Sequence, residues 1–521
     1  MPRWVNDAVF YEIYPASFYD TDGDGIGDIN GIIQKLDYIQ SLGCNAVWLN
    51  VCFDSPFKDG GYDIRDYKKV APRYGTNADL VRCFEEAHRR GMHLLLDLVP
   101  CHTSEEHPWF CESRKPERGE YSDRYIWTNH CFERPGALPC VGGESDRNGL
   151  YVISFFKSQP ALNYGFLHPD KPWQLPMDHP ACLATREALW DVMRFWLDLG
   201  CDGFRVDMAR WLVHGDDERF SGAASIWREF RARLDKEYPE AALMAEWGCP
   251  EQALKAGFHF DLYIHRDGNA YSRLMRAFKG TMDGAPRGAD ESYFCRRART
   301  SIVPFLKEYL PQYESTKEDG LICWITGNHD VMRPRGNLSP QELKLAYAFL
   351  LTMPGVPQIY YGDEIGMRYL QVPTREGGYY RSGSRTPMQW KNGVNLGFSV
   401  CSPERLYLPV DGAPDAPTVA AEEADPDSLL HTVRALLALR RREPALRANA
   451  PFAVHFARED SRLFVWRRGA LYAAVNPGEG ECAFGAPDVR ETLFVIGACT
   501  AESGRVRLGP QSFAVLRGED I

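Results

Sequence analysis

The sequence predicts an α/β fold, a (β/α)8 TIM barrel with an inserted subdomain after its third strand and a C-terminal antiparallel β-sandwich. Short apolar runs alternate with amphipathic stretches through most of the chain, which is typical of a barrel of alternating strands and helices. The alternation is interrupted once, and its character changes near the C-terminus. A chain of 521 residues is long enough for these several packed units.

Eight apolar runs are the candidate barrel strands. Most are short and nearly continuous, as expected of parallel strands that are buried on both faces. They lie at 9–14, 46–50, 93–99, 203–209, 242–248, 260–264, 321–330 and 357–364. Helical stretches separate them, such as the one near 77–91, which ends at Gly91, and the one at 428–442 that completes the barrel.

The predicted domain boundaries follow from these changes of pattern. Residues 1–100 form the first part of the barrel, and 171–450 form the remainder. Residues 101–170 contain Pro, Gly and Cys without a sustained period, so we interpret them as the inserted subdomain. Short alternating strands with Gly and Pro turns then predict a β-sandwich over 451–521.

Composition and charge limit the classes of function. The hydrophobic fraction is 44% and the net charge is −11, with acidic and basic residues interleaved. We therefore expect a protein that binds neither nucleic acid nor membranes, and a neutral substrate rather than a phosphorylated one. The N-terminal sequence lacks the features of a signal peptide, and the 15 cysteines are scattered, so we expect a cytoplasmic protein with reduced thiols. The oligomeric state is not predicted.

Charged and imidazole side chains lie at the ends of several predicted strands. They are Asp97, His102, Arg205, Asp207, Glu246, His329 and Asp330. In barrel enzymes the active site forms at the C-terminal ends of the strands, so these side chains should converge on one face. Arg205 precedes Asp207 by two residues and should share its side of the strand, where a cation would keep that carboxylate ionised. Two carboxylates flanking a glycosidic bond are the working parts of glycoside hydrolysis.

Several segments resemble the conserved regions of the α-amylase family of glycoside hydrolases. They are DLVPCHTS (97–104), GFRVDMAR (203–210), AEWG (245–248) and TGNHD (326–330), and QPALNYGF (159–166) resembles a fifth region. They occur in the family's order, and the likeness covers almost the whole chain. The resemblance implies Asp207 as nucleophile, Glu246 as general acid/base and Asp330 as transition-state stabiliser. It also implies that the sugar in subsite −1 is bound by His102, Arg205 and His329 and stacks on Tyr62.

A further motif is similar to one in the oligo-1,6-glucosidase and α-glucosidase branch of the family, SRTPMQW at 384–390. The resemblance implies that Arg385 pairs with Asp59 and closes the pocket behind a non-reducing terminal glucose. Such a site favours exo action on short substrates. Two positions depart from the family. Cys101 replaces an Asn that ligates calcium in amylase branches, so a calcium site at this position is not predicted. Met208 follows the nucleophile where the branch has Val or a small residue, which leaves linkage preference open.

An acidic loop near the N-terminus predicts a structural metal site. Residues 20–28 carry carboxylates at relative positions one, three, five and nine, with Gly at six, as in the first part of a calcium loop. The predicted ligands for Ca2+ or Mg2+ are Asp20, Asp22, Asp24, the carbonyl of Ile26, and Asp28. Position twelve is Gly31, so the bidentate Glu of an EF-hand is missing, but the oligo-1,6-glucosidase branch has a similar loop.

The sequence thus predicts a retaining α-glycoside hydrolase, an exo-acting α-glucosidase on short malto- or isomalto-oligosaccharides. It would work by double displacement through a covalent glycosyl-enzyme, with its two carboxyl groups about 5–5.5 Å apart. A transglycosylase or sugar isomerase, with a trehalose- or sucrose-type rearrangement, stays open because it would use the same residues. The presence of Asp207, Glu246 and Asp330 disfavours a non-catalytic binding protein, and Arg205 within the cluster disfavours a metal-dependent barrel enzyme.

Overall fold

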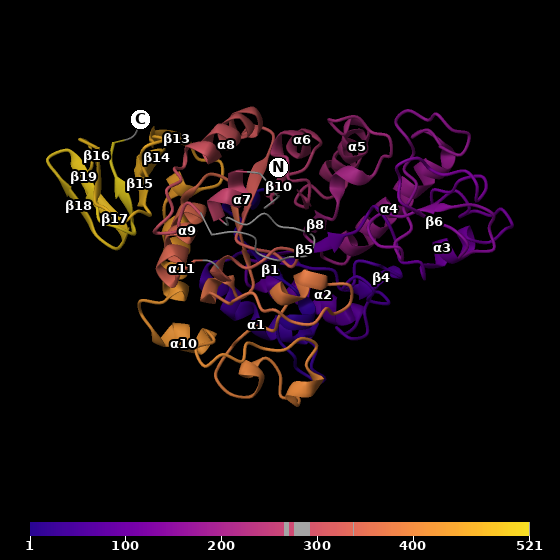
Figure 1. The fold of residues 1–521 in the computed structure, drawn as a ribbon, viewed down its shortest axis with the longest axis horizontal. Coiled ribbons are helices and arrows are strands. Elements are labelled where there is room, and N and C mark those ends of the chain that lie inside the picture. Colours follow the sequence, from indigo (N-terminus) through magenta and orange to yellow (C-terminus); the bar gives the residue numbers. More distant parts are fainter. Residues whose placement is uncertain (265–269, 276–291, 337, 520–521) are drawn as a thin grey trace.

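A computed structural model describes residues 1–264, 270–275, 292–336 and 338–519. Parallel strands close into a barrel in the order β1-β12-β11-β10-β9-β8-β5-β2 (Figure 1). They are β1 (Phe10–Ile13), β2 (Ala46–Leu49), β5 (His93–Leu98), β8 (Gly203–Val206), β9 (Ala242–Ala245), β10 (Phe260–Tyr263), β11 (Leu321–Ile325) and β12 (Val356–Tyr360). The predicted TIM barrel is confirmed. The strands at 203–209, 242–248 and 321–330 are shorter than predicted because the chain leaves the sheet before the site residues.

Helices surround the barrel and follow most of its strands (Figure 1). They are α1 (Ile29–Leu42), α2 (Asn77–Arg89), α4 (Pro180–Asp198), α5 (Ser221–Glu237), α6 (Pro250–Lys255), α7 (Ala270–Met275), α8 (Val303–Thr316), α9 (Pro340–Thr352), α10 (Val419–Ala424) and α11 (Leu429–Arg442). Their ends have local causes. Thr76 and Asp79 form a capping box at the start of α2, and Gly43 ends α1 in the left-handed conformation with a φ of 104°.

The segment after β5 folds outside the barrel, as predicted. It contains the short helix α3 (Pro108–Ser113) and a two-stranded ribbon of β6 (Cys140–Val141) and β7 (Tyr151–Val152). A second small ribbon, β3 (Phe53–Asp54) with β4 (Asp66–Val70), follows β2. The segment after β5 has an apolar cluster of its own around Val152 and Phe166. Figure 1 shows it at the opposite end of the molecule from the C-terminal sheets.

The C-terminal strands form two antiparallel sheets, ordered β13-β14-β15-β20-β17 and β16-β19-β18. Their bounds are β13 (Ala453–Phe456), β14 (Phe464–Arg468), β15 (Leu471–Asn476), β16 (Cys482–Gly485), β17 (Glu491–Ile496), β18 (Cys499–Glu502), β19 (Arg505–Leu508) and β20 (Ser512–Arg517). Alternation explains the packing. Phe464 and Trp466 belong to the barrel core, whereas Val465 packs in a separate cluster with Val506 and Leu508 of the smaller sheet.

Within the described ranges, no helix has both the length and the apolar character that crossing a membrane requires.

Candidate active site

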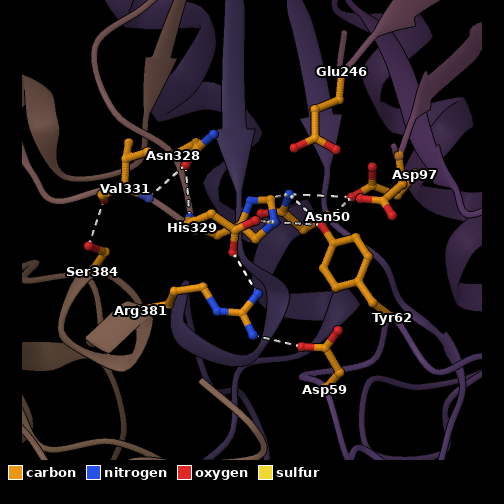
Figure 2. A network of polar contacts seen from close by, with 12 residues as sticks. Asn50, Asp59, Tyr62, Asp97, Glu246, Asn328, His329, Val331, Arg381 and Ser384 are labelled. Atoms are coloured by element: carbon orange, nitrogen blue, oxygen red, sulfur yellow. Dashed lines mark hydrogen bonds and ion pairs between the residues drawn. The ribbon is translucent and has the colours of Figure 1, made fainter. Parts of the chain in front are cut away.

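The predicted catalytic side chains lie together at the C-terminal ends of the barrel strands. Asp207 and Glu246 each follow the last residue of their strand, β8 and β9, and a strand-like hydrogen bond still holds each backbone. The Asp207 N–H donates to the Leu98 carbonyl at 2.8 Å, and the Glu246 N–H donates to the Val206 carbonyl at 3.0 Å. The barrel therefore fixes both backbones and leaves their side chains at its open end. In Figure 2 the Glu246 carboxylate points toward the network around His329 and Tyr62.

One fully buried guanidinium holds three carboxylates. Nη1 of Arg205 lies 2.9 Å from Asp97 Oδ1 and 2.8 Å from Asp207 Oδ1. Nη2 lies 3.1 Å from Glu246 Oε2, and the guanidinium sits over the ring of Trp48. Arg205 therefore fixes the nucleophile and acid/base candidates relative to one another. The sequence placed Arg205 beside Asp207, but it did not predict that the same cation also holds Asp97.

The pKa of Asp207 depends on more groups than the sequence expectation considered. Burial raises the pKa of Asp207 well above its ordinary value, and the carboxylate of Glu246 raises it further. Arg205 opposes these effects, but it is a single cation among three carboxylates. The sequence expectation considered only Arg205 and did not include the other acids or the cost of burial. Three acids that share a single cation suit a reaction that needs one of them protonated.

Tyr62 and His329 line the site beside this cluster (Figure 2). Their rings stack with centroids 5.3 Å apart, and the Tyr62 hydroxyl is 2.8 Å from both Asp97 Oδ2 and His329 Nε2. On its other side, His329 Nδ1 lies 2.8 Å from Glu12 Oε1. Burial lowers the pKa of His329 well below its ordinary value, so the imidazole is neutral at physiological pH. Both residues are thereby fixed in orientation before any sugar binds.

One ring nitrogen of His102 has no hydrogen-bond partner in the described part of the chain. Its Nε2 lies 3.2 Å from the backbone carbonyl of Tyr62, whereas Nδ1 is buried without a hydrogen-bond partner there. Burial lowers the pKa of His102 to about 4, so the ring is neutral at pH 7. Because Nε2 faces an acceptor, it carries the proton, and Nδ1 is left to accept a hydrogen bond. This nitrogen suits a sugar hydroxyl.

Two arginines surround Asp330 on the opposite side of the site. Asp330 Oδ1 accepts from Arg385 Nη2 at 2.8 Å and from Arg381 Nη1 at 3.2 Å. Burial by itself raises the pKa of Asp330, but His329, which is protonated at the acidic pH where Asp330 titrates, and the cations Arg381 and Arg385 outweigh it and hold the pKa below its ordinary value. Asp330 is therefore ionised at neutral pH, as a stabiliser of positive charge must be.

The predicted pairing of Arg385 with Asp59 is wrong. Asp59 Oδ1 instead accepts from Arg381 Nη2 at 2.8 Å, and its Oδ2 accepts from Gln159 at 2.8 Å (Figure 2). Arg385 contacts Asp330 and donates through Nε to the His329 carbonyl at 2.8 Å. The two arginines are four residues apart, and the helical turn over Tyr379–Ser384 brings both to one site. The sequence motif alone therefore does not determine which one meets Asp59.

Sequence reasoning missed several residues that complete the site. They are Glu12, Asn50, Gln159 and Arg381. A signal existed for some of them. Glu12 is a charged residue inside the apolar run of β1, Asn50 directly follows β2, and Gln159 opens the segment that resembles the fifth family region. Arg381 lies outside the quoted motif and carried no such signal.

The acidic loop between β1 and α1 brings three of the predicted ligands together. Oxygen atoms of Asp20, Asp22 and Asp28 all lie within 4.8 Å of one another. Asp24 is not in this group, and its Oδ1 accepts from the N–H of Ile26 at 2.7 Å. Burial raises the pKa of Asp28, and the nearby acid Asp22 raises it further. The clustered carboxylate oxygens match the hard oxygen ligands that Ca2+ and Mg2+ prefer.

Comparisons with known proteins identify the family. The model of the α-amylase catalytic domain matches residues 12–449. The trehalose synthase/amylase TreS of Mycobacterium tuberculosis is 35% identical over 486 residues, which cover 86% of this chain and 77% of that protein. The oligo-1,6-glucosidase of Parageobacillus thermoglucosidasius is 32% identical over 500 residues and covers 84% of each chain.

Solved structures agree with this relationship. The α-glucosyl transfer enzyme XgtA superposes with a TM-score of 0.80 at 27% identity and covers 100% of both chains. An isomaltulose synthase variant from Erwinia rhapontici NX5, in complex with its natural substrate sucrose, superposes with a TM-score of 0.80 at 25% identity and also covers 100% of both chains. The chain therefore belongs to the α-amylase family and is an enzyme related to both glycosidases and glucosyl-transferring enzymes.

Proposed function

We propose that the protein is a retaining, exo-acting α-glucosidase that removes the terminal glucosyl unit from short malto- or isomalto-oligosaccharides. The arrangement of Asp207 and Glu246 around one buried guanidinium carries the proposal. Two fixed carboxyl groups are what double displacement at an anomeric carbon requires. The relationship to an oligo-1,6-glucosidase supports the substrate class.

The reaction proceeds in two displacements. Asp207 attacks the anomeric carbon while Glu246 gives its proton to the glycosidic oxygen, so the C–O bond breaks and the aglycone leaves as an alcohol. Glu246 then accepts a proton from water, whose oxygen attacks the same carbon and releases Asp207. The product keeps the α configuration. Asp330 is ionised between its arginines and stabilises the positive charge that develops on the sugar.

The contacts of Asp59 support exo action. Asp59 is buried and held from both sides, by Arg381 and by Gln159. Arg381 also reaches Asp330, so the charged pair is next to the position of the transition-state stabiliser. We propose that this pair binds the hydroxyls at the non-reducing end and blocks a longer chain on that side. It takes the role that sequence reasoning gave to Arg385 and Asp59.

The test is a time course with maltose, isomaltose, sucrose, trehalose and maltotriose, in which every sugar product is followed by chromatography. We expect free glucose from the malto- or isomalto-substrates, released first as the α-anomer, which proton NMR detects. First release of β-glucose would contradict retention. Cleavage of internal bonds in longer maltodextrins would contradict exo action.

A second candidate function is rearrangement of a disaccharide, in which a sugar rather than water resolves the covalent intermediate. The 35% identity to a trehalose synthase/amylase and the 25% identity to an isomaltulose synthase favour it. The same time course separates the two. Appearance of an isomeric disaccharide without a matching amount of glucose would replace the hydrolase by an isomerase, because both reactions pass through the same glycosyl-enzyme.

We also propose that the loop between β1 and α1 binds a structural Ca2+ or Mg2+ through Asp20, Asp22 and Asp28, with Asp24 and the Ile26 carbonyl completing the ligands. A cation there would offset the repulsion among the acids. Extensive chelation should lower the melting temperature by several degrees, and added Ca2+ should restore it. Asp22→Asn should weaken this response. An unchanged melting temperature after chelation would refute the site.

A further inference from the structure

The two departures from the family pattern, Cys101 and Met208, are in contact. The Cys101 thiol lies 3.3 Å from the carbonyl oxygen of Met208. Cys101 follows β5 and is 4% exposed, and Met208 directly follows Asp207. Their contact therefore joins the loop after one barrel strand to the peptide beside the nucleophile.

Met208 has an unusual backbone conformation. Its φ is 46° and its ψ is 36°, in the left-handed region that residues other than glycine rarely adopt. Such a residue persists only where its surroundings hold it. Both of its backbone polar groups are held here. The carbonyl accepts from the Cys101 thiol at 3.3 Å and from the Trp211 N–H at 2.9 Å, and the Met208 N–H donates to Glu246 Oε2 at 2.9 Å.

The Cys101 thiol is a donor in this contact. Burial raises its pKa well above the ordinary value, and the carboxylates of Asp207 and Glu246 raise it further. The group therefore stays S–H at neutral pH. Since a carbonyl oxygen only accepts, the thiol proton must point at Met208.

The contacts of Glu246 fall on one of its oxygens. Oε2 accepts from the Met208 N–H at 2.9 Å and lies 3.1 Å from Arg205 Nη2. Oε1 is thereby left as the oxygen for proton transfer. Any change in the Met208 peptide rotates this carboxyl group, and a general acid must lie within hydrogen-bond reach of the oxygen that it protonates.

We infer that Cys101 is a positioning residue for Glu246. Its hydrogen bond adds to that of the Trp211 N–H on the Met208 carbonyl, so that the peptide keeps the Met208 N–H on Oε2 and leaves Oε1 toward the glycosidic oxygen. The inference rests on the proposed role of Glu246 as acid/base. It gives the thiol a role in leaving-group protonation that acts through the backbone and involves no contact with substrate.

Leaving groups of different quality test this role. Cys101→Ala and the volume-matched Cys101→Val remove the donor, and Cys101→Ser keeps one. We expect kcat/KM for maltose or isomaltose, whichever the enzyme cleaves, to fall about 10–30-fold in the first two variants, because alcohol leaving groups need the proton. For α-glucosyl fluoride, which needs little proton assistance, the fall should be less than about 3-fold. Cys101→Ser should recover most of the loss.

Cys201→Ala is the matched control. Cys201 is also a buried thiol that donates to a carbonyl, that of Gly203 at 3.0 Å, but it precedes β8 at the end away from Asp207. It should leave the ratio of the two substrates unchanged. An equal loss on both substrates, or no loss on either, in Cys101→Ala and Cys101→Val would overturn the inference. If the unmodified protein turned over no α-glucoside, including α-glucosyl fluoride, the proposed function on which the inference rests would be refuted instead.

Discussion

One side of the catalytic face contains more carboxylates than cations, and the other contains as many arginines as carboxylates. On the first side, at the ends of β5, β8 and β9, three acids share Arg205. On the second side, Arg381 pairs with both Asp59 and Asp330, and Arg385 pairs with Asp330. Most of these groups are buried, and Asp330 and Glu246 are half-buried, so desolvation acts on each side.

The two aspartates at the centre of these sides respond in opposite directions. The pKa of Asp207 is raised, by burial first and then by Glu246, whereas the pKa of Asp330 is lowered because His329 and two arginines outweigh burial. Asp59 keeps a raised pKa, since burial exceeds what Arg381 and Arg385 contribute. Burial alone therefore does not decide the charge of a carboxyl group. Burial and the number and proximity of the cations decide it together.

The largest expected effect comes from removing the nucleophile of the acid-rich side. Asp207→Asn should reduce turnover by about four orders of magnitude or more, the scale of losing a group on which covalent catalysis depends. Initial rates and a melting curve check this. Turnover near that of the unmodified enzyme would show that the charge excess around Arg205 serves another purpose.

A smaller effect is expected from the arginine-rich side. Arg381→Met removes partners of both Asp59 and Asp330, so kcat/KM should fall about 100-fold, mainly through a higher KM. Longer maltodextrins should become better substrates relative to maltose. Arg375→Met, an exposed arginine of the same loop, is the control. An unchanged KM and chain-length preference would show that the Asp59–Arg381 pair does not bind the sugar.

The excess of carboxylates over cations around Arg205 can be reduced by one charge. Asp97 is one of the groups that raise the pKa of Asp207, so Asp97→Asn should lower that pKa. Because Asp207 attacks only when ionised, the acid limb of the kcat/KM profile should move to lower pH, by about 0.5–1 unit, with roughly a tenfold loss at the optimum. Asp202→Asn, at the other end of β8, should leave the limb in place. A limb that stays in place in both variants would separate Asp97 from the titration of Asp207.

The smallest effect is on stability, and its sign differs between the two sides. A raised pKa means that ionised Asp207 costs stability above the ordinary value of about 3.9, and the cost disappears as pH falls through the folded pKa. Asp207→Asn should therefore raise Tm at pH 7 by about 1–3 °C, with a gain that fades in acid. The lowered pKa of Asp330 reverses the sign, so Asp330→Asn should lower Tm at pH 7, with a deficit that persists down to about pH 3.9 and fades only below it. Differential scanning calorimetry between pH 3 and 8 compares the two variants. Equal signs would contradict the charge difference.

Local pattern was sufficient for the framework of the fold. Continuous apolar runs between amphipathic helices predicted the strands of the closed barrel, and the alternation after Ala453 predicted the antiparallel sheets. The resemblance then pointed to the proposed catalytic residues, which lie together in the structure because family motifs occur at strand ends where the barrel gathers side chains. These inferences succeeded because burial on both faces of a strand leaves a signal within a few consecutive residues.

Long-range polar contacts were not predictable in the same way. Arg381 and Arg385 are chemically identical and one turn apart, so only the packed structure decides which of them meets Asp59. The sequence showed Cys101 and Met208 as separate departures, whereas folding brings them into contact.

The sequence by itself thus determined the barrel, its additions and which carboxyl groups are proposed to react. Tertiary structure alone decided the charge around them. A pKa depends on how many ionic groups lie within a few ångströms, and those groups come from strands that are far apart along the chain. Arg205 is shared by acids from three different strand ends, and that arrangement exists only once the barrel has closed.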